Sequence, residues 1–227
     1  MTGSRWGRML RGAVCCLFLA ACGSSQEKPI EYIYLAFGAS DATGVGAVPL
    51  TDGYVYLIAR ELDRQIHGVF LVNLGVPGAR IDLIKEQASV AKELGTKADA
   101  VTLWTGANDL VNGDDPRSFQ EQLRGLLRIV MQDLSRTLVV VNLPDLTMLS
   151  RFRTSPSPSV TPARIAAFNR AIAEETRSAG GVLVDLHASP IRNELVFDVD
   201  GFHPNTAGHQ EIARQLSHML LRPVDRR

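Results

Sequence analysis

Short, nearly continuous apolar runs alternate along the chain with longer segments in which apolar residues recur every three to four positions. The runs predict five strands, over residues 32–37, 69–73, 100–104, 138–141 and 181–185. The periodic segments predict helices, over residues 52–65, 81–94, 119–134, 162–176 and 206–221. Because continuous apolar strands are typical of a parallel sheet covered on both faces, we expect an α/β fold. The expected architecture is a three-layer α/β/α sandwich around a five-stranded parallel sheet, of flavodoxin-like type.

Composition narrows the class of protein without pointing to a ligand. The 227 residues suit one domain, and 45% hydrophobic residues exclude a disordered or collagen-like chain. The 24 basic and 24 acidic residues balance, which argues against nucleic acid as the main partner. Three cysteines are too few for a disulfide framework. No apolar run reaches the ~18 residues of an ordinary membrane-spanning helix.

The first segment of the chain is predicted to be a targeting signal. Arginines without acidic residues precede a short apolar stretch, as in a secretory signal, and the stretch ends in Leu-Ala-Ala-Cys22. This tetrapeptide resembles the lipobox of bacterial lipoproteins, in which the cysteine is lipidated and becomes the mature N-terminus; the alternative is a plain secretory signal. The resemblance implies a signal peptide over residues 1–21, a tether over 22–30, and export with lipid anchoring to a bacterial membrane on its periplasmic or cell-surface side.

Residues with catalytic chemistry stand just after the predicted strands. Ser40 follows the first strand, Gly75 the second and Asn108 the third, while Asp200-Gly-Phe-His203 precedes the last helix. Since the carboxyl ends of parallel strands meet at one edge of a sheet, these four segments are expected to converge there. Each also has an ordinary structural explanation as a turn, cap or surface residue. Their occurrence together in this order favours a catalytic site.

The four segments resemble the SGNH (GDSL-like) hydrolase family over about residues 32–221, most specifically in Gly-Ala-Asn108-Asp and Asp200-Gly-Phe-His203-Pro. The resemblance implies that the domain, over residues 31–227, hydrolyses carboxylic esters as an esterase, lipase or thioesterase through an acyl-enzyme. It implies Ser40 as nucleophile, His203 as general base and Asp200 as the carboxylate that orients it. It also implies an oxyanion hole made of the backbone N–H groups of Ser40 and Gly75 and the side-chain amide of Asn108. No cofactor is implied.

Elementary chemistry supports each of these roles. A serine hydroxyl needs an adjacent base at neutral pH, and an imidazole can accept that proton and return it to the leaving group. A carboxylate on the other ring nitrogen fixes the tautomer. Donors directed at the developing oxyanion stabilise the transition state. No His-Glu-x-x-His or Cys-x-x-Cys spacing occurs, so no metal is expected.

The sequence departs from the family pattern at the nucleophile. The usual Gly-Asp-Ser-Leu is Gly-Ala-Ser40-Asp41, so the acidic residue follows the serine instead of preceding it. We hypothesise that Asp41 partly replaces the missing acid. We further expect Asp109 to brace the loop of Asn108, and Trp104 to pack in the core rather than to line the substrate site.

Two motifs also allow other interpretations of the fold. Gly-Ala-Ser40-Asp-Ala nearly matches the G-x-S-x-G elbow of α/β-hydrolases, but its serine follows the first strand and the acid lies only three residues before His203. Gly44-Val-Gly46 is a weak match to a dinucleotide-binding loop.

Carbohydrate O-deacetylation within the same family, and a non-catalytic lipid-anchored binding protein, are the main alternative functions. No long apolar lid is evident, which favours a short acyl group. Residues 41–49 and 145–160 are expected to shape the pocket.

Overall fold

Five parallel strands form one sheet in this computed structural model, which describes residues 29–189 and 192–221. The strands are β1 (Tyr32–Gly38), β2 (Val69–Asn73), β3 (Ala100–Trp104), β4 (Leu138–Val141) and β5 (Val182–Val184). Their order across the sheet is β2-β1-β3-β4-β5, and every neighbouring pair is parallel. The chain therefore reverses its direction of winding between β1 and β3, as in flavodoxin-like sheets. The predicted fold class is confirmed.

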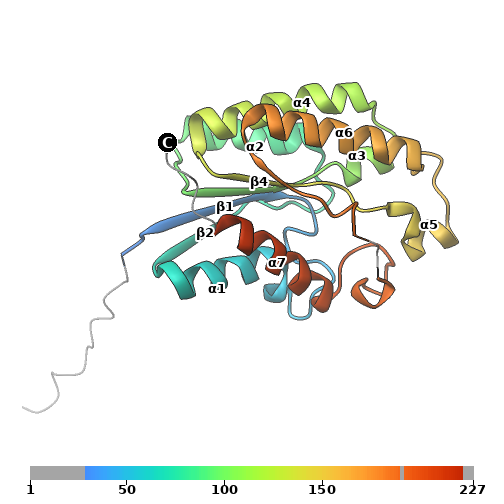
Figure 1. Cartoon of the computed structure of the whole chain (residues 1–227), viewed down its shortest axis with the longest axis horizontal. Helices are drawn as coiled ribbons and strands as arrows, with labels where there is room; N and C mark the ends of the chain where they lie inside the picture. The colour runs from blue at the N-terminus through green and yellow to red at the C-terminus, as the bar shows by residue number, and fades with distance from the viewer. Residues whose placement is uncertain (1–28, 190–191, 222–227) are drawn as a thin grey trace, which may run out of the picture.

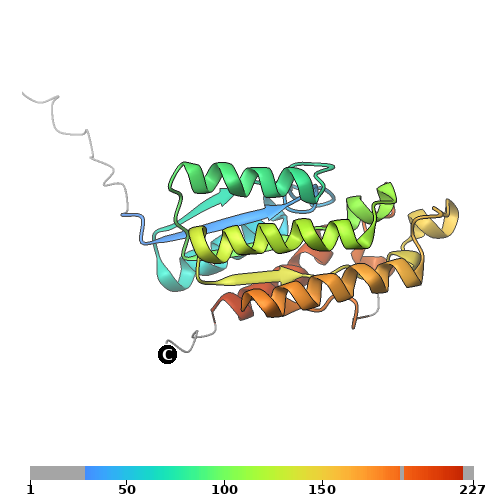
Figure 2. The same ribbon diagram turned by 90° about the horizontal axis from the view of Figure 1, so that it is seen from above.

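Helices cover both faces of this sheet (Figures 1 and 2). The longer ones are α1 (Tyr54–Ile66), α2 (Ile81–Glu93), α4 (Pro116–Ile129), α6 (Pro162–Ala179) and α7 (Thr206–Leu220). One layer contains α2, α4 and α6, packed side by side, and the other contains α1 packed against α7. None of the described helices is both long and apolar enough to cross a membrane.

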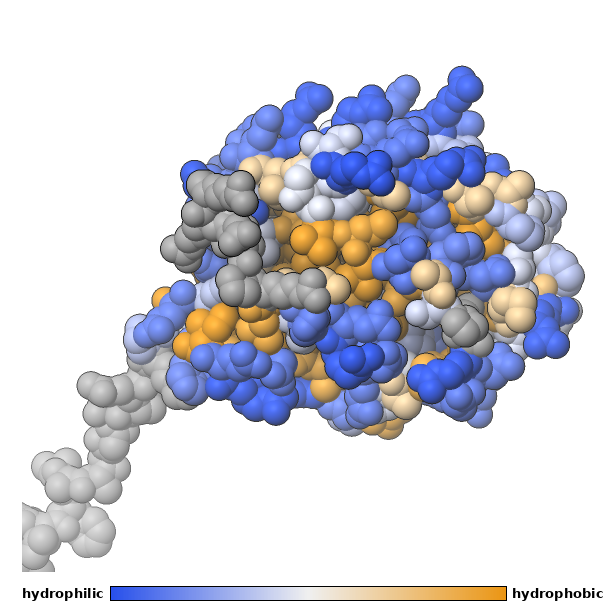
Figure 3. All heavy atoms as spheres, in the orientation of Figure 1, coloured by the Kyte–Doolittle hydropathy of each residue, from blue (hydrophilic) through white to orange (hydrophobic). Residues whose placement is uncertain are grey.

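Strand β1 shows how the two layers produce a continuous apolar run. Leu35 and Phe37 pack in the cluster beneath α2, α4 and α6, whereas Tyr34 and Ala36 pack in the cluster beneath α1 and α7. All four are fully buried, because successive side chains of a strand point to opposite faces and both faces are covered. Figure 3 shows the complementary pattern outside: polar side chains cover the helices, and apolar surface gathers between the layers along the β5 edge, where Val182 is 44% exposed.

Two short α-helices were not predicted, and the bounds of the long helices differ from the prediction by a few residues, as α6 shows by ending at Ala179 instead of residue 176. The additions are α3 (Ala107–Asn112) and α5 (Ser150–Thr154), which are too short to show a helical period. Helix α4 begins at Pro116, because the Asp115 side chain caps it by accepting two backbone N–H bonds. Its last predicted turn continues as a π-helical turn over Val130–Leu134.

Candidate active site

The structure joins Ser40, His203 and Asp200 in one chain of hydrogen bonds at the carboxyl edge of the sheet. Ser40 Oγ lies 2.7 Å from His203 Nε2, and His203 Nδ1 lies 2.6 Å from Asp200 Oδ2. Because a carboxylate only accepts, Nδ1 carries the ring proton and Nε2 accepts from the serine hydroxyl. This is the tautomer in which the imidazole can take the hydroxyl proton.

The turn that holds Asp200 is built by its own side chain. Asp200 Oδ1 accepts the backbone N–H groups of Phe202 and His203, at 2.8 and 3.0 Å, which closes the loop and points Oδ2 at the imidazole. Gly201 adopts a φ of 63°, a conformation that favours glycine. Burial opposes ionisation of Asp200, but the hydrogen bonds from the His203 side chain and from these two N–H groups outweigh it and lower the pKa of the carboxyl.

Asn108 lies near the start of α3, two residues beyond Gly106. Its side-chain amide donates to the Ala79 carbonyl at 2.9 Å, and both residues line the same cavity as Ser40. The next residue, Asp109, is fully buried and accepts the backbone N–H of Ile81 at 3.0 Å. These two bonds fasten the loop after β2 to α3, as expected for a brace. Burial raises the pKa of Asp109 to about 6.

Gly75 does not have the geometry expected of an oxyanion donor. Its backbone N–H already donates to Asn73 Oδ1 at 3.0 Å. The Asn73 side chain, at the end of β2, therefore already accepts a hydrogen bond from the backbone N–H that was predicted to bind the oxyanion. Gly78 precedes Ala79 at a φ of 79°, and its N–H meets no acceptor within the described ranges. The backbone N–H of Ser40 likewise has none there.

His209 on α7 contributes to the site although the sequence analysis assigned it no role. It is fully buried, accepts the Tyr54 backbone N–H at Nδ1 (3.2 Å) and donates from Nε2 to the Val45 carbonyl (3.0 Å). Burial lowers the pKa of its imidazole, consistent with this neutral state. The ring thus fixes the loop after Ser40 from the far end of the chain. No local sequence signal marks a contact that spans 155 residues.

Gly46 in that loop allows close packing of the backbone. A Cβ on Gly46 would lie 2.1 Å from the Pro204 carbonyl oxygen and 3.3 Å from His203 Cβ. Gly46 therefore allows the loop after Ser40 to approach the histidine closely. This explains the Gly44-Val-Gly46 pattern without a dinucleotide.

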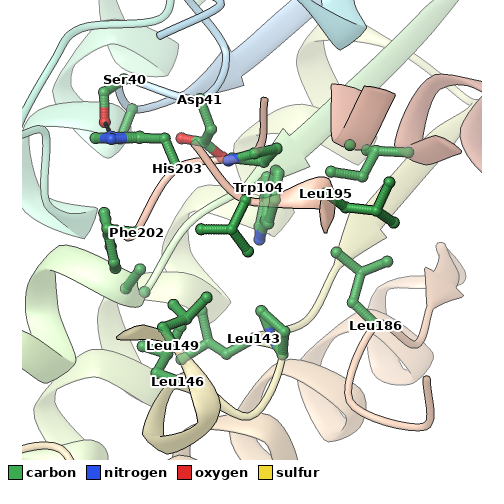
Figure 4. A pocket seen from close by; sticks show the side chains of 18 of the residues that line it. Ser40, Asp41, Trp104, Leu143, Leu146, Leu149, Leu186, Leu195, Phe202 and His203 are labelled. Atoms are coloured by element: carbon green, nitrogen blue, oxygen red, sulfur yellow. Dashed lines mark hydrogen bonds between the residues drawn. The ribbon is translucent and has the colours of Figure 1, made fainter. Parts of the chain in front are cut away.

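A cavity of about 320 Å³ opens beside the serine–histidine pair, and Figure 4 shows its apolar side chains facing that pair. Its wall includes Leu143, Leu146, Leu149, Leu186, Leu195 and Phe202. Trp104 is 7% exposed and lines the cavity as well, so it belongs to both the core and the wall. Both segments that were expected to shape the pocket contribute to its wall. Residues 41–49 contribute Asp41, and residues 145–160 contribute Leu146 and Leu149. Residues 154–160 contribute none: residues 154–156 and 158 are exposed, whereas Val160 is buried in the core.

Comparison with known proteins identifies the family. The chain matches the GDSL-like Lipase/Acylhydrolase family over residues 36–211. It belongs to this family. That makes the domain a member of a family of enzymes, and the predicted family is confirmed.

Individual relatives agree with this assignment. The chain is 28% identical over 208 residues to the GDSL-like esterase Rv1075c of Mycobacterium tuberculosis, covering 87% of this chain and 64% of that relative's length. TesA has a similar fold, with a TM-score of 0.68 at 18% identity over 83% of this chain and 98% of its own. The acetylxylan esterase Axe2 of Geobacillus stearothermophilus gives a TM-score of 0.64 at 17% identity, over 86% and 96%.

Within residues 29–189 and 192–221, no group of three or more His, Cys, Asp and Glu side chains is arranged to hold a metal ion. Cys22, the signal peptide and most of the tether lie outside the described residues. The exposed Asp198, near the triad in sequence, takes no part in it.

Removing the side-chain amide of Asn108 is expected to slow the chemical step. In Asn108→Ala, kcat should fall by roughly 10²–10³, the cost of one lost oxyanion donor, with a smaller change in KM. Steady-state kinetics on a p-nitrophenyl ester measure both constants. Asn112→Ala, an exposed change on the same helix, is the matched control. A rise in KM with kcat unchanged would show that Asn108 only binds substrate.

Proposed function

We propose that this protein hydrolyses carboxylic esters through an acyl-enzyme on Ser40. The observation that carries the proposal is the hydrogen-bonded chain from Ser40 Oγ through His203 to Asp200, which opens onto an apolar cavity. His203 Nε2 takes the hydroxyl proton as Oγ attacks the ester carbonyl, and Asp200 stabilises the imidazolium. The proton then passes to the departing alcohol. In the second half, His203 activates a water that releases the acid and restores the serine.

The oxyanion would be held by the backbone N–H of Ser40 and the side-chain amide of Asn108. We propose Gly78 as the third donor in place of Gly75, because the Gly75 amide is already taken and Gly78 stands beside the carbonyl that receives Asn108. The Asn108 NH₂ group has two hydrogens, so one can remain bonded to Ala79 while the other is available to the oxyanion.

The cavity favours an ester with an apolar group over an acetylated carbohydrate. At about 30 Å³ for each water-sized group, about 320 Å³ holds roughly ten heavy atoms. Six of the lining side chains are leucine or phenylalanine, which offer no hydrogen bonds to sugar hydroxyls. The cavity thus accommodates a longer chain than the short acyl group favoured by the sequence.

A panel of p-nitrophenyl esters from acetate to octanoate, with acetylated xylan as a second arm, tests this function. Each buried methylene is worth about 0.8 kcal/mol, so kcat/KM is expected to rise up to about fourfold per methylene as the cavity fills. Release of acetate from xylan in preference to these esters would favour the deacetylase. Binding of esters without any turnover would favour the non-catalytic binding protein.

We also propose that the mature protein is lipid-anchored through Cys22 outside the cytoplasm. The lipobox-like Leu-Ala-Ala-Cys22 supports this. Metabolic labelling with an alkyne fatty acid should mark the membrane-bound wild type and not Cys22→Ser. Equal labelling of wild type and Cys22→Ser would show that Cys22 is not the lipidated residue.

A further inference from the structure

A carboxylate stands inside the cavity next to the nucleophile. Asp41 directly follows Ser40 and lines the cavity, and Figure 4 shows its carboxyl group beside the imidazole of His203 and the ring of Trp104. Within residues 29–189 and 192–221, no side chain donates a hydrogen bond to this carboxylate and no lysine or arginine pairs with it. Backbone N–H groups of its own turn and the charge of His203 are what favour its ionised form.

The Asp41 side chain is only partly exposed to water. Burial raises the pKa of Asp41 to about 6, against the opposing effects of the local N–H groups and of His203. The titratable groups that face it are His203 and the buried Tyr54, whose own pKa is raised by burial and by the charge of Asp41. The charged residues farther along the cavity wall, Arg192 and Glu211, pair with other side chains. Asp41 therefore keeps its charge in a place where charge is costly.

The known requirements of the site do not explain this residue. Asp200 already occupies Nδ1 of His203, and Asp41 forms no hydrogen bond with either Ser40 or His203. The hypothesis that Asp41 replaces the acid missing before the serine therefore gains no support from the geometry. Nor does the charge of Asp41 stabilise the fold, because a raised pKa means that ionisation favours the unfolded chain.

We propose that Asp41 is a specificity-determining residue that accepts a hydrogen bond from a substrate hydroxyl a few bonds from the ester carbonyl. The inference rests on the proposed ester hydrolysis at Ser40. Asp41 is one residue from the nucleophile, so its partner must lie close to the carbonyl carbon, while the leucines receive the aliphatic remainder. The substrate class is an ester that combines an aliphatic chain with a nearby hydroxyl, carried on either the acyl or the alcohol side.

The physical reason is the cost of an unpaired charge. A plain aliphatic ester displaces the water that solvates Asp41 and offers no donor in return, whereas a hydroxylated ester replaces the lost hydrogen bond. An ammonium group would also pair with the carboxylate, but its own desolvation among leucines makes it the poorer ligand.

Two isosteric ester pairs test the proposal, with acid release followed by titration. Ethyl 3-hydroxyhexanoate against ethyl hexanoate places the hydroxyl on the acyl side, and 2-hydroxyethyl hexanoate against propyl hexanoate places it on the alcohol side. In at least one pair, wild type should favour the hydroxylated ester about tenfold or more in kcat/KM. Asp41→Leu should bring that ratio down about tenfold, and Asp41→Asn, which keeps an acceptor oxygen, should retain part of it. Gln215→Leu, which removes another polar group from the wall, should leave the ratio as in wild type. The same ratios in wild type and Asp41→Leu, for both pairs, would overturn the proposal.

A binding measurement separates this inference from the proposed function. In a Ser40→Ala background, calorimetry compares 3-hydroxyhexanamide with hexanamide, and N-(2-hydroxyethyl)hexanamide with N-propylhexanamide, with and without Asp41→Leu. A hydroxyl preference that depends on Asp41, in a protein that hydrolyses no ester, would support the inference and refute the function. Ester hydrolysis by wild type, without a hydroxyl preference that depends on Asp41, would support the proposed function and refute the inference.

A thermal readout excludes a merely structural role for Asp41. Because its pKa is raised, wild type loses stability as pH rises from the unfolded value near 3.8 through about 6. Asp41→Asn should therefore have a higher Tm than wild type at pH 7.5, and the difference should shrink toward pH 4. A lower Tm for Asp41→Asn at both pH values would assign the residue to the fold and count against a role in specificity.

Discussion

Ser40→Ala is expected to lower kcat for ester hydrolysis by roughly 10⁴–10⁶, leaving only the contribution of the remaining donors and of binding. The nucleophile and its 2.7 Å contact with His203 Nε2 are lost together. No other hydroxyl takes part in the hydrogen-bonded chain that the described residues form at the catalytic edge. The rate is measured on the ester that wild type hydrolyses best.

The fold should survive this change, because the removed oxygen binds only the imidazole. A Tm within a few degrees of wild type is the expected control result. Ser155→Ala, an exposed serine after α5, should keep full activity. Turnover by Ser40→Ala comparable with wild type would remove Ser40 from the mechanism.

Asp200→Asn is expected to reduce kcat by about 10⁴ while the turn around it persists. The amide oxygen can still accept the N–H groups of Phe202 and His203, but an NH₂ facing Nδ1 favours the tautomer with its proton on Nε2. That tautomer cannot accept the Ser40 proton. The loss of the negative charge also removes the partner of the imidazolium.

The matched control is Asp198→Asn, two residues away and exposed, which should leave kcat within about twofold because it touches no reacting group. A drop of tenfold or less for Asp200→Asn would mean that His203 does not need this carboxylate.

The sequence predicted most of the sheet and the triad because both depend on local patterns. Strands buried on both faces are recorded in continuous apolar runs, and the turn Asp200-Gly-Phe-His203 forms its own hydrogen bonds. Parallel strands then bring distant segments to one edge, so the residue after β1 meets the residue before α7. The roles of these residues came from the resemblance to the family, and the strand order explains why they meet.

Contacts between distant elements were the part that sequence could not supply. The choice between Gly75 and its neighbours depends on where Asn73 directs its side chain. His209 acts on a loop 164 residues away, and nothing near it in the sequence indicates this. The unpartnered state of Asp41 likewise depends on which side chains surround it, since an aspartate after a serine is ordinary in a turn.

We propose that His203 activates the Ser40 hydroxyl to attack an electrophilic centre. Intact-mass spectrometry after exposure to a fluorophosphonate tests this most directly, because the reagent phosphonylates only an activated serine. We expect one adduct per chain, mapped to Ser40, absent in Ser40→Ala and strongly slowed in His203→Ala. An adduct on a different residue, or equal labelling of wild type and Ser40→Ala, would contradict the account.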